Sequence, residues 1–240
     1  MNPNITIRPF TWEDLTPLAQ CYACGRIWAD TPWNEWLKCP KCPADQNNFG
    51  VTFKGRNCPK CGSKLTSFWK VQDVENDIKT QLGKAFAKGY LALKKSQIVG
   101  FTWGYPVEIK ITISVPTLDL TVPVNSNLAP SLASDQRDTL KGYTAGYIDE
   151  VGVRPAFRGK GIGARLTWEI VEYFRSLDLP LAFLRTDIRA KSATSMYEKQ
   201  CFKQDPFLVD PIYEHRRYWI LNLKYGYYMM PRPHYEWERE

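Results

Sequence analysis

Two matched Cys-x-x-Cys pairs are the residues best suited to chemistry in this 240-residue sequence. They are Cys39-Pro-Lys-Cys42 and Cys58-Pro-Lys-Cys61, and 15 residues separate them. Each pair presents two sulfurs on one side of a tight turn, so two pairs can complete the tetrahedron that Zn²⁺ prefers. A redox dithiol needs only one pair. We therefore expect a structural zinc site whose ligands are Cys39, Cys42, Cys58 and Cys61.

A third pair, Cys21 and Cys24, leaves alternatives open. It lies in a helix predicted over about residues 12–29, where two cysteines ordinarily serve as small apolar side chains. One alternative zinc site uses Cys21, Cys24, Cys58 and Cys61, and another is a cluster of two metals and six thiolates. Both require the helix to end early, so both rank below the site above.

A glycine-rich turn forms a second candidate site. Residues 147–153 are rich in β-branched and aromatic side chains, which predicts a strand, and a helix is predicted from Ala164. Three glycines lie between them: Gly159, Gly161 and Gly163. Glycines let the backbone approach a ligand closely, and a helix N-terminus favours an anion. With Arg158 and Lys160 adjacent, the expected ligand is a diphosphate.

The common phosphate-binding patterns do not match this turn. A Walker loop needs Gly-x4-Gly-Lys-Ser/Thr and a dinucleotide fold needs Gly-x-Gly-x-x-Gly, whereas these glycines are spaced by two. The turn instead resembles motif A of the GNAT superfamily of acyl-CoA-dependent N-acyltransferases, Arg/Gln-x-x-Gly-x-Gly/Ala. Arg158, Gly161 and Gly163 occupy its defined positions, after Val153-x-Pro155.

The resemblance extends from residue 5 to about residue 224. It includes Pro32-Trp-Asn-Glu35 and, near the end, the family pattern Asn-x-x-Ala-x-x-x-Tyr-Glu-x-x-Gly-Phe. The residues that match this pattern are Ala193, Tyr197, Glu198 and Phe202. Ala190 replaces the Asn, which puts a cofactor contact in doubt, and Cys201 replaces the Gly, which implies a differently shaped helix exit.

The fold that this resemblance implies is α/β (α+β): a mixed, mostly antiparallel sheet flanked by helices. We expect one acyltransferase domain over residues 1–240 with two insertions, the zinc-knuckle segment 37–65 and an extended strand or loop segment 106–142.

The resemblance also implies acetyl-CoA as co-substrate, and it assigns residues to it. Backbone amides of Val151 and Val153 would bind the pantetheine and the thioester carbonyl. The diphosphate would be held by the turn that follows, at Arg158, Gly159, Lys160, Gly161, Ile162 and Gly163.

Three side chains are candidates for proton transfer. Tyr197 occupies the family's general-acid position, and a core tyrosine is the ordinary alternative. Asp149 and Glu150 lie on the motif A strand, where family members place a carboxylate base. Alternation sends them to opposite faces, so only one can serve, although a bulge would change that parity. Glu150 is narrowly preferred, and a structural ion pair is the alternative for either.

Several further elements are expected to position these residues. They are strands at 5–9, 51–54, 90–94, 97–105, 181–187 and 218–223, and helices at 12–29, 68–88, 164–176 and 190–200. Thr11-Trp-Glu-Asp14 is a capping-box-like start for the first helix.

Composition narrows the class of protein. Hydrophobic content of 44% with nine tryptophans suits a buried core, and no apolar run approaches the roughly 18 residues of a membrane span. The first residues lack the pattern of a secretory signal, so a cytoplasmic location is expected, where cysteines serve metals or redox chemistry. The net charge of +7 suits an anionic cofactor, and the basic residues do not form one continuous tract.

The sequence leaves three functions open. The first is an N-acetyltransferase that moves an acetyl group to a primary amine of a small molecule or a protein, by direct attack in a ternary complex. The second is a non-catalytic CoA-binding protein that docks a macromolecule through its zinc insert. The third, an enzyme acting on nucleic acid, is not favoured, because few aromatic side chains beyond Phe49 and Phe53 accompany the insert's basic residues. The oligomeric state stays open, a dimer included.

Overall fold

The computed structural model describes residues 5–28, 30–32, 35–43, 47–50, 52–109, 143–210 and 213–224. Several sequence-based interpretations fall partly outside these residues. They concern Ala29 at the end of the first predicted helix, Trp33 and Asn34 of the Pro-Trp-Asn-Glu segment, Val51 of the strand predicted at 51–54, and residues 110–142 of the second insertion.

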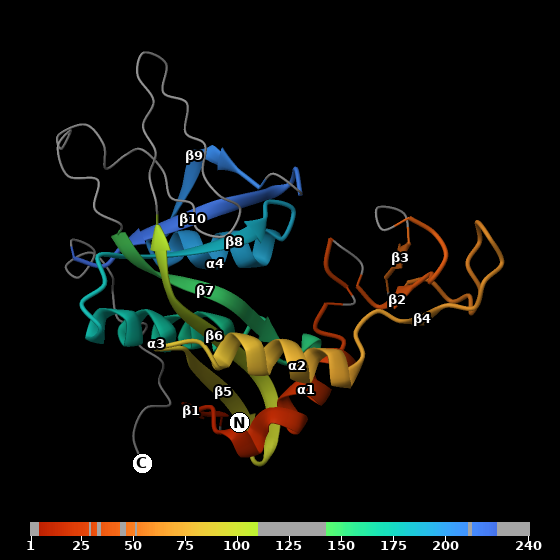
Figure 1. Cartoon of the computed structure of the whole chain (residues 1–240), viewed down its shortest axis with the longest axis horizontal. Coiled ribbons are helices and arrows are strands. Elements are labelled where there is room, and N and C mark those ends of the chain that lie inside the picture. The colour runs from red at the N-terminus through yellow and green to blue at the C-terminus, as the bar shows by residue number, and fades with distance from the viewer. Residues whose placement is uncertain are drawn as a thin grey trace. The chain divides into compact units, whose positions relative to one another are not determined.

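The main element of the fold is a seven-stranded sheet with the strand order β1-β5-β6-β7-β8-β10-β9 (Figure 1). Its strands are β1 Ile5–Pro9, β5 Lys88–Lys94, β6 Gln97–Ile109, β7 Tyr143–Val153, β8 Leu181–Asp187, β9 Lys203–Val209 and β10 Arg216–Asn222. β7 and β8 run parallel, whereas β1 with β5 and β10 with both β8 and β9 run antiparallel. The expected mixed, mostly antiparallel sheet is confirmed.

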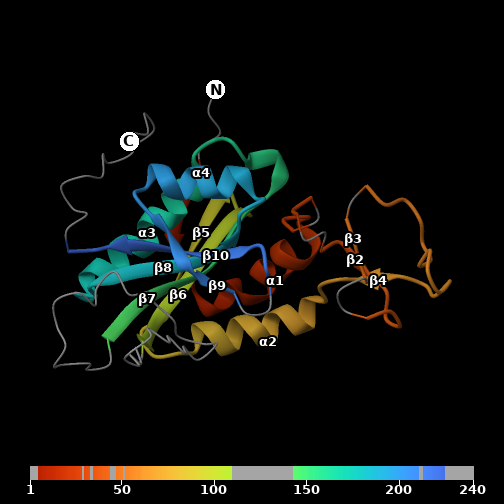
Figure 2. The same cartoon turned by 90° about the horizontal axis from the view of Figure 1, so that it is seen from above.

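Within the described ranges the α-helices are α1 Leu15–Cys24, α2 Val71–Leu82, α3 Ile162–Ser176 and α4 Lys191–Lys199. Figure 2 shows them from a second direction. A separate three-stranded sheet between α1 and α2 has the order β3-β2-β4. Its strands are only two residues long: β2 Leu37–Lys38, β3 Asn48–Phe49 and β4 Thr66–Ser67. This small sheet is the framework of the predicted zinc insert.

The chain forms two compact units, each with its own hydrophobic core. The first comprises Met1–Lys84, Gly89–Thr102 and Glu150–Leu166, and the second Ala85–Lys88, Trp103–Asp149 and Thr167–Glu240. Core residues of the first unit are Ala92, Val99, Ile162 and Leu166. Those of the second are Ala145, Leu181, Phe183 and Tyr218. Burying one of the Val, Leu, Ile or Phe side chains of these cores contributes about 1.5–3 kcal/mol to folding. The predicted boundaries of the two insertions stay predictions.

The start of the first helix follows the predicted capping box. Residues 12–14 form a 3₁₀ turn, and the Asp14 carboxylate accepts a hydrogen bond from the Thr11 amide at 2.9 Å. Arg8 donates to both oxygens of the same carboxylate, at 2.7 and 2.6 Å. The Arg8 hydrogen bonds hold the pKa of Asp14 down to about 2, so this carboxylate is ionised at neutral pH.

The end of the first helix was predicted too far along the chain. α1 stops at Cys24, whereas the hydrophobic pattern favoured a helix to about residue 29. Gly25 follows, and a Cβ there would lie 2.0 Å from the Cys21 carbonyl oxygen. Arg26 then takes the left-handed conformation, with φ of 56°. Glycine is a poor helix former, and a left-handed residue ends the helix.

Other sequence-based assignments need smaller corrections. α2 is shorter than the predicted 68–88, because the Phe68 amide, which follows β4 directly, donates to the Trp36 carbonyl at 3.1 Å and so lies outside the helix. The strand predicted at 51–54 is wrong over its described part, where Phe53 closes a turn onto Gly50 instead. β9 was missed, because its sequence Lys-Gln-Asp-Pro-Phe-Leu-Val lacks a clear alternation.

Candidate active site and metal centre

The four cysteines of the two matched pairs come together in the insert. The Sγ atoms of Cys39 and Cys61 lie 3.4 Å apart, and that of Cys42 lies 3.7 Å from those of both Cys58 and Cys61. All four sulfurs lie within 4.8 Å of one another. A tetrahedral zinc with Zn–S bonds of ~2.3 Å separates its sulfurs by about 3.8 Å. The observed spacing therefore fits zinc.

The second Cys-x-x-Cys pair, Cys58 to Cys61, forms a tight turn whose hydrogen-bond donors stabilise thiolates. Gly62 has φ of +72°, and its amide donates to the Cys58 carbonyl at 2.9 Å. The Ser63 hydroxyl and amide lower the pKa of the Cys61 thiol to about 6. Burial opposes ionisation of Cys58, but amide hydrogen bonds from Cys61 and Lys60 outweigh it and lower the pKa of this thiol. These donors stabilise the thiolate form that binds metal.

The Cys42 thiol shows why four sulfurs this close together favour a bound cation. Hydrogen bonds with Cys39, and less strongly with Cys58 and Cys61, raise the pKa of the Cys42 thiol to about 12. Negative charges this close repel one another, and a divalent cation relieves that repulsion.

The insert has only a small apolar core of its own. Cys39, Cys58 and Leu65 are buried there, and Leu37, Phe49 and Phe53 pack around them. Backbone bonds add little, such as the one from the Cys39 amide to the Asn47 carbonyl at 2.9 Å. A segment of this size cannot bury enough surface to fold alone.

Cys21 and Cys24 take no part in this cluster. Cys21 is buried, and its thiol donates to the Ile98 carbonyl at 3.5 Å. The Arg154 Nε donates to the same sulfur, also at 3.5 Å. Among the described residues, the sulfurs that lie close enough together to hold a metal are those of Cys39, Cys42, Cys58 and Cys61. The early end of α1 therefore does not produce the alternative zinc sites.

The glycine-rich turn follows β7 as expected, but the helix begins two residues before the predicted Ala164, so Gly163 lies in the first turn of α3. Gly159 and Gly161 have φ of +72° and +78°, a conformation that side chains disfavour. A Cβ added to Gly159 would meet no atom within 4 Å, so the backbone faces open space there. α3 begins at Ile162, and its 15 residues direct the positive end of a helix dipole at the turn. Alternating conformations of this kind form concave anion sites.

The basic side chains of the turn donate hydrogen bonds to other parts of the protein. Arg158 Nη1 donates to both carboxylate oxygens of Asp30, at 2.8 and 3.0 Å, and Nη2 donates to the Ile27 carbonyl at 2.6 Å. The Arg158 amide donates to the Pro155 carbonyl at 3.2 Å. Lys160 Nζ donates to the Ala156 carbonyl at 3.1 Å. Arg158 thus anchors the turn to the segment after α1, and the backbone shapes the anion site.

The two candidate carboxylates bond to different tyrosines. Glu150 Oε1 accepts from the Tyr22 hydroxyl at 3.2 Å, and Asp149 Oδ2 accepts from the Tyr105 hydroxyl at 3.2 Å. Both carboxylates are half-buried. Burial, followed by the negative charge of Asp149, raises the pKa of the Tyr105 hydroxyl well above its usual value. Tyr105 is therefore a hydrogen-bond donor to Asp149 at neutral pH.

Tyr197 lies on α4 and is 6% exposed. Its ring packs edge-on against Phe202, with centroids 5.7 Å apart, and its carbonyl accepts from the Phe202 amide at 3.0 Å. Cys201 has φ of 64°, the conformation that a glycine adopts without strain. The helix exit at Cys201 is therefore left-handed, and the expected difference from the family in the shape of this exit stays a prediction.

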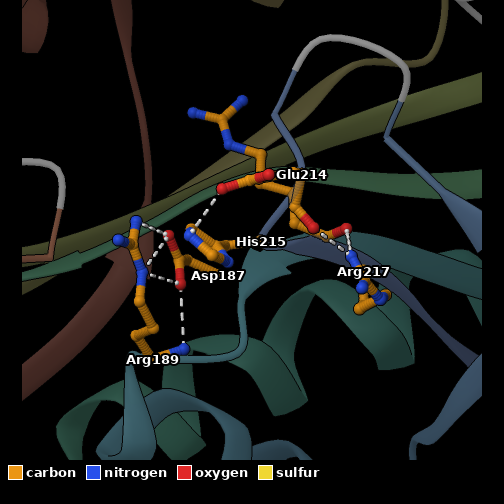
Figure 3. Close-up of polar contacts among 6 residues, drawn as sticks. Asp187, Arg189, Glu214, His215 and Arg217 are labelled. Atoms are coloured by element: carbon orange, nitrogen blue, oxygen red, sulfur yellow. Dashed lines mark hydrogen bonds and ion pairs between the residues drawn. The ribbon is translucent and has the colours of Figure 1, made fainter.

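A charged cluster that the sequence did not indicate fixes the turn into α4 (Figure 3). Arg189 donates to the buried Asp187 carboxylate through Nε at 2.9 Å, Nη2 at 2.6 Å and its own amide at 2.8 Å. Burial opposes ionisation of Asp187, but these bonds outweigh it and lower its pKa. The Ile188 amide donates to the His215 carbonyl at 3.0 Å. His215 Nε2 in turn lies 3.1 Å from Glu214 Oε1.

A second missed cluster lies on β8. Arg185 Nε donates to the Tyr147 hydroxyl and its Nη1 to the buried Asp210 carboxylate, both at 3.1 Å. The Tyr213 amide donates to Asp210 Oδ1 at 3.0 Å. The two partners of Arg185 lie 38 and 25 positions away in the chain, so no short sequence pattern could predict these contacts.

Comparison with known proteins decides the family. The sequence profile of the Acetyltransferase (GNAT) family matches residues 63–202. The chain belongs to the GNAT acetyltransferase family. The matched region begins after Cys61, so the four cysteines of the sulfur cluster lie outside the residues that the family profile matches.

Solved structures share the GNAT fold at low sequence identity. Arabidopsis thaliana NAA60 in complex with acetyl-CoA is 15% identical, with a TM-score of 0.54 over 91% of this chain and 98% of that one. An N-acetyltransferase from Staphylococcus aureus Mu50 is 13% identical, with a TM-score of 0.52 over 92% and 99%. The ribosomal-protein-alanine N-acetyltransferase from Brucella melitensis is 13% identical, with a TM-score of 0.51 over 90% and 99%. The comparison with curated proteins gave no match. No helix among the described residues is both long and apolar enough to cross a bilayer.

Proposed function

We propose that this GNAT protein is an N-acetyltransferase that moves an acetyl group from acetyl-CoA to a primary amine by direct attack in a ternary complex. The observation that carries the proposal is the turn of Gly159 and Gly161, both left-handed, placed directly before α3. Membership of the GNAT acetyltransferase family supports it, as does the acetyl-CoA complex among the similar structures.

In this proposal the backbone holds the co-substrate. The diphosphate lies against the turn of residues 158–163, and the amides of Val151 and Val153 donate to the pantetheine and the thioester carbonyl. When bound, acetyl-CoA supplies an activated acyl group. Amides fixed where negative charge develops on the carbonyl oxygen lower the barrier to attack. Arg158 contributes by holding the turn, through its bonds to Asp30 and Ile27.

The amine must lose a proton as it attacks, and Glu150 is the proposed base. The Tyr22 hydroxyl donates to Glu150 and orients its carboxylate. The ring of Tyr22 is itself held by Phe101 and Trp69, at centroid distances of 5.6 and 5.3 Å. Asp149, held by Tyr105, is the alternative base. A carboxylate within reach of the amine, directly or through one water, can take this proton.

The departing CoA thiolate needs a proton, and Tyr197 is the proposed donor. A C–N bond forms as the C–S bond breaks. The amine nitrogen loses one proton to the base, and the sulfur gains one proton from Tyr197, so the reaction is balanced. Zinc has no part in this chemistry. We propose that Cys39, Cys42, Cys58 and Cys61 bind it as a structural ion of the insert.

The co-substrate site is tested by replacing Gly161 with glutamate. The Gly161→Glu change puts a side chain on a left-handed residue and a negative charge beside the diphosphate, so acetyl-CoA affinity should fall at least about tenfold. Isothermal titration calorimetry measures it. Gln97→Glu, an exposed change of equal charge at the start of β6, is the control and should bind like the wild type. Equal affinity in the two variants would rule out the turn as the diphosphate site.

A further inference from the structure

The positive charge of this chain is concentrated around the zinc site. Residues 37–70, the insert with the segment that joins it to α2, contain seven of the 32 Lys and Arg residues but only one of the 25 Asp and Glu residues. This segment therefore carries a net +6 of the chain's +7, and the other 206 residues are nearly neutral. The basic residues are scattered along the chain, but the excess of charge is local.

Most of this charge is exposed to solvent. We define the basic surface as the six exposed cations of residues 37–70: Lys41, Lys54, Arg56, Lys60, Lys64 and Lys70. The one acidic residue of the segment, Asp45, lies outside the described residues. Because the cations lie on the two knuckles and on the segments that the four sulfurs connect, the metal-held fold gathers them on one small framework.

The aromatic rings of the insert serve its own packing. Phe49 and Phe53 lie 4.7 Å apart by centroids, within the small apolar core. Phe68 packs on Trp69 at 5.0 Å and lies under Lys38 at 5.4 Å. In the described part of this segment no aromatic side chain is exposed. The surface therefore offers charge without rings on which nucleic-acid bases could stack.

The base of the insert connects to the proposed catalytic carboxylate. The Phe68 amide donates to the Trp36 carbonyl at 3.1 Å, which closes the insert at β2 and β4. The next residue, Trp69, packs edge-on against the Tyr22 ring at 5.3 Å. The hydroxyl of Tyr22 bonds to Glu150 at 3.2 Å. A single aromatic ring thus links the root of the insert to the residue that would accept the amine's proton.

We propose that the basic surface docks an acidic segment of the polypeptide that carries the acceptor amine. The proposal rests on the proposed acetyltransferase function and narrows its acceptor from any primary amine to an amine on an acidic protein. Six of the seven cations in residues 37–70 are lysines, compact charges that suit carboxylates in varied positions. No ring is exposed in the described part of residues 37–70, and this disfavours single-stranded nucleic acid as the ligand of this surface.

Direct binding is the first test, and it needs no turnover. The probe is a fluorescein-labelled peptide of about ten glutamates, titrated with the zinc-loaded full chain and followed by fluorescence polarisation. The insert variant carries Lys54→Glu, Arg56→Glu, Lys64→Glu and Lys70→Glu, which all lie outside the Cys-x-x-Cys pairs. The matched control carries four exposed reversals elsewhere: Lys95→Glu, Lys191→Glu, Lys203→Glu and Lys224→Glu. Zinc content and circular dichroism confirm that both variants are folded.

We expect the insert variant to lose at least about tenfold in affinity for the peptide, and the control to lose no more than about twofold. Raising the salt from about 0.02 to 0.3 M should weaken wild-type binding strongly, because exposed charges are screened. Equal losses in the two variants would show that only overall charge matters and would overturn the proposal. So would an unlabelled RNA duplex that displaces the peptide at much lower concentration than free polyglutamate does.

A kinetic readout separates this proposal from the acetyltransferase function. Two acceptor peptides with the same amine terminus, one with an acidic and one with a neutral tail, are compared. We expect the acidic tail to lower KM by about tenfold with kcat unchanged, and the difference to disappear in the insert variant. Turnover without any effect of the tail would overturn the docking surface alone. Peptide binding without turnover would instead contradict the proposed function and leave the surface standing as an acidic-protein binding site.

Discussion

Replacing Cys58 with serine is expected to abolish zinc binding and to unfold the insert, while acetyl-CoA binding is largely retained. Structural zinc contributes about 10–16 kcal/mol in small peptide sites, far more than the apolar contacts around Leu65 can supply. The hydrophobic core of Ala92, Val99 and Leu166 is formed by residues outside the insert, so loss of the metal does not remove it. Metal analysis of the purified variant, with calorimetry of acetyl-CoA binding, measures both parts.

Cys21→Ser is the matched control, since it makes the same chemical change outside the sulfur cluster. We expect one equivalent of zinc per chain to remain, because the Cys21 thiol bonds to the Ile98 carbonyl and not to the other sulfurs. Zinc lost from the Cys21 variant would mean that α1 supplies a ligand. Zinc retained at one tight equivalent in the Cys58 variant would contradict the four-cysteine site.

Removing the hydroxyl of Tyr197 is expected to lower kcat by at least about a hundredfold. General acid catalysis contributes roughly 10²–10⁴ in rate, and phenylalanine keeps the edge-on contact with Phe202. KM for acetyl-CoA should change little, since the proposed role concerns the leaving thiolate. Steady-state kinetics over a range of pH, alongside thermal unfolding, separates a catalytic loss from a structural one.

Tyr173→Phe serves as the control for this variant. It removes a hydroxyl that donates to the Phe86 carbonyl at 3.0 Å, and it should leave kcat within about twofold of wild type. An equally small change in the Tyr197 variant would place this tyrosine in the core and would require another proton donor.

The parts of the site that the sequence revealed depend on short-range chemistry. The zinc site could be predicted from the spacing of its four cysteines, because two Cys-x-x-Cys pairs supply the four ligands of a tetrahedral site. Gly159 and Gly161 are similar, since left-handed positions in such a turn favour glycine and so leave a pattern in the sequence. Most strands followed from alternation, and the mixed, mostly antiparallel sheet that the family resemblance implied is confirmed.

Many of the parts that the sequence did not reveal depend on contacts between distant residues, and others, such as the Asp187–Arg189 pair, are local but carry no recognisable pattern. The hydrophobic pattern after Cys24 still suited a helix, and only the left-handed Arg26 shows where the chain turns. Arg158 matched a cofactor-binding position, yet its side chain anchors to Asp30, 128 positions earlier. The Arg185–Asp210 pair lies on β8 and a residue beyond β9, and β9 itself went unpredicted. Tertiary contacts of this kind override local pattern.

The central claim, acetyl transfer from acetyl-CoA to an amine, is tested most directly by a turnover assay. Release of the CoA thiol is followed with acetyl-CoA and a panel of small amines, lysine peptides and peptides with free N-termini, acidic sequences included. Mass spectrometry identifies the acetylated product. The prediction is thiol release matched one-to-one by amide formation on at least one class of amine, and loss of both in Gly161→Glu. Tight acetyl-CoA binding with no thiol release above hydrolysis for any amine would contradict the claim and leave a non-catalytic CoA-binding protein.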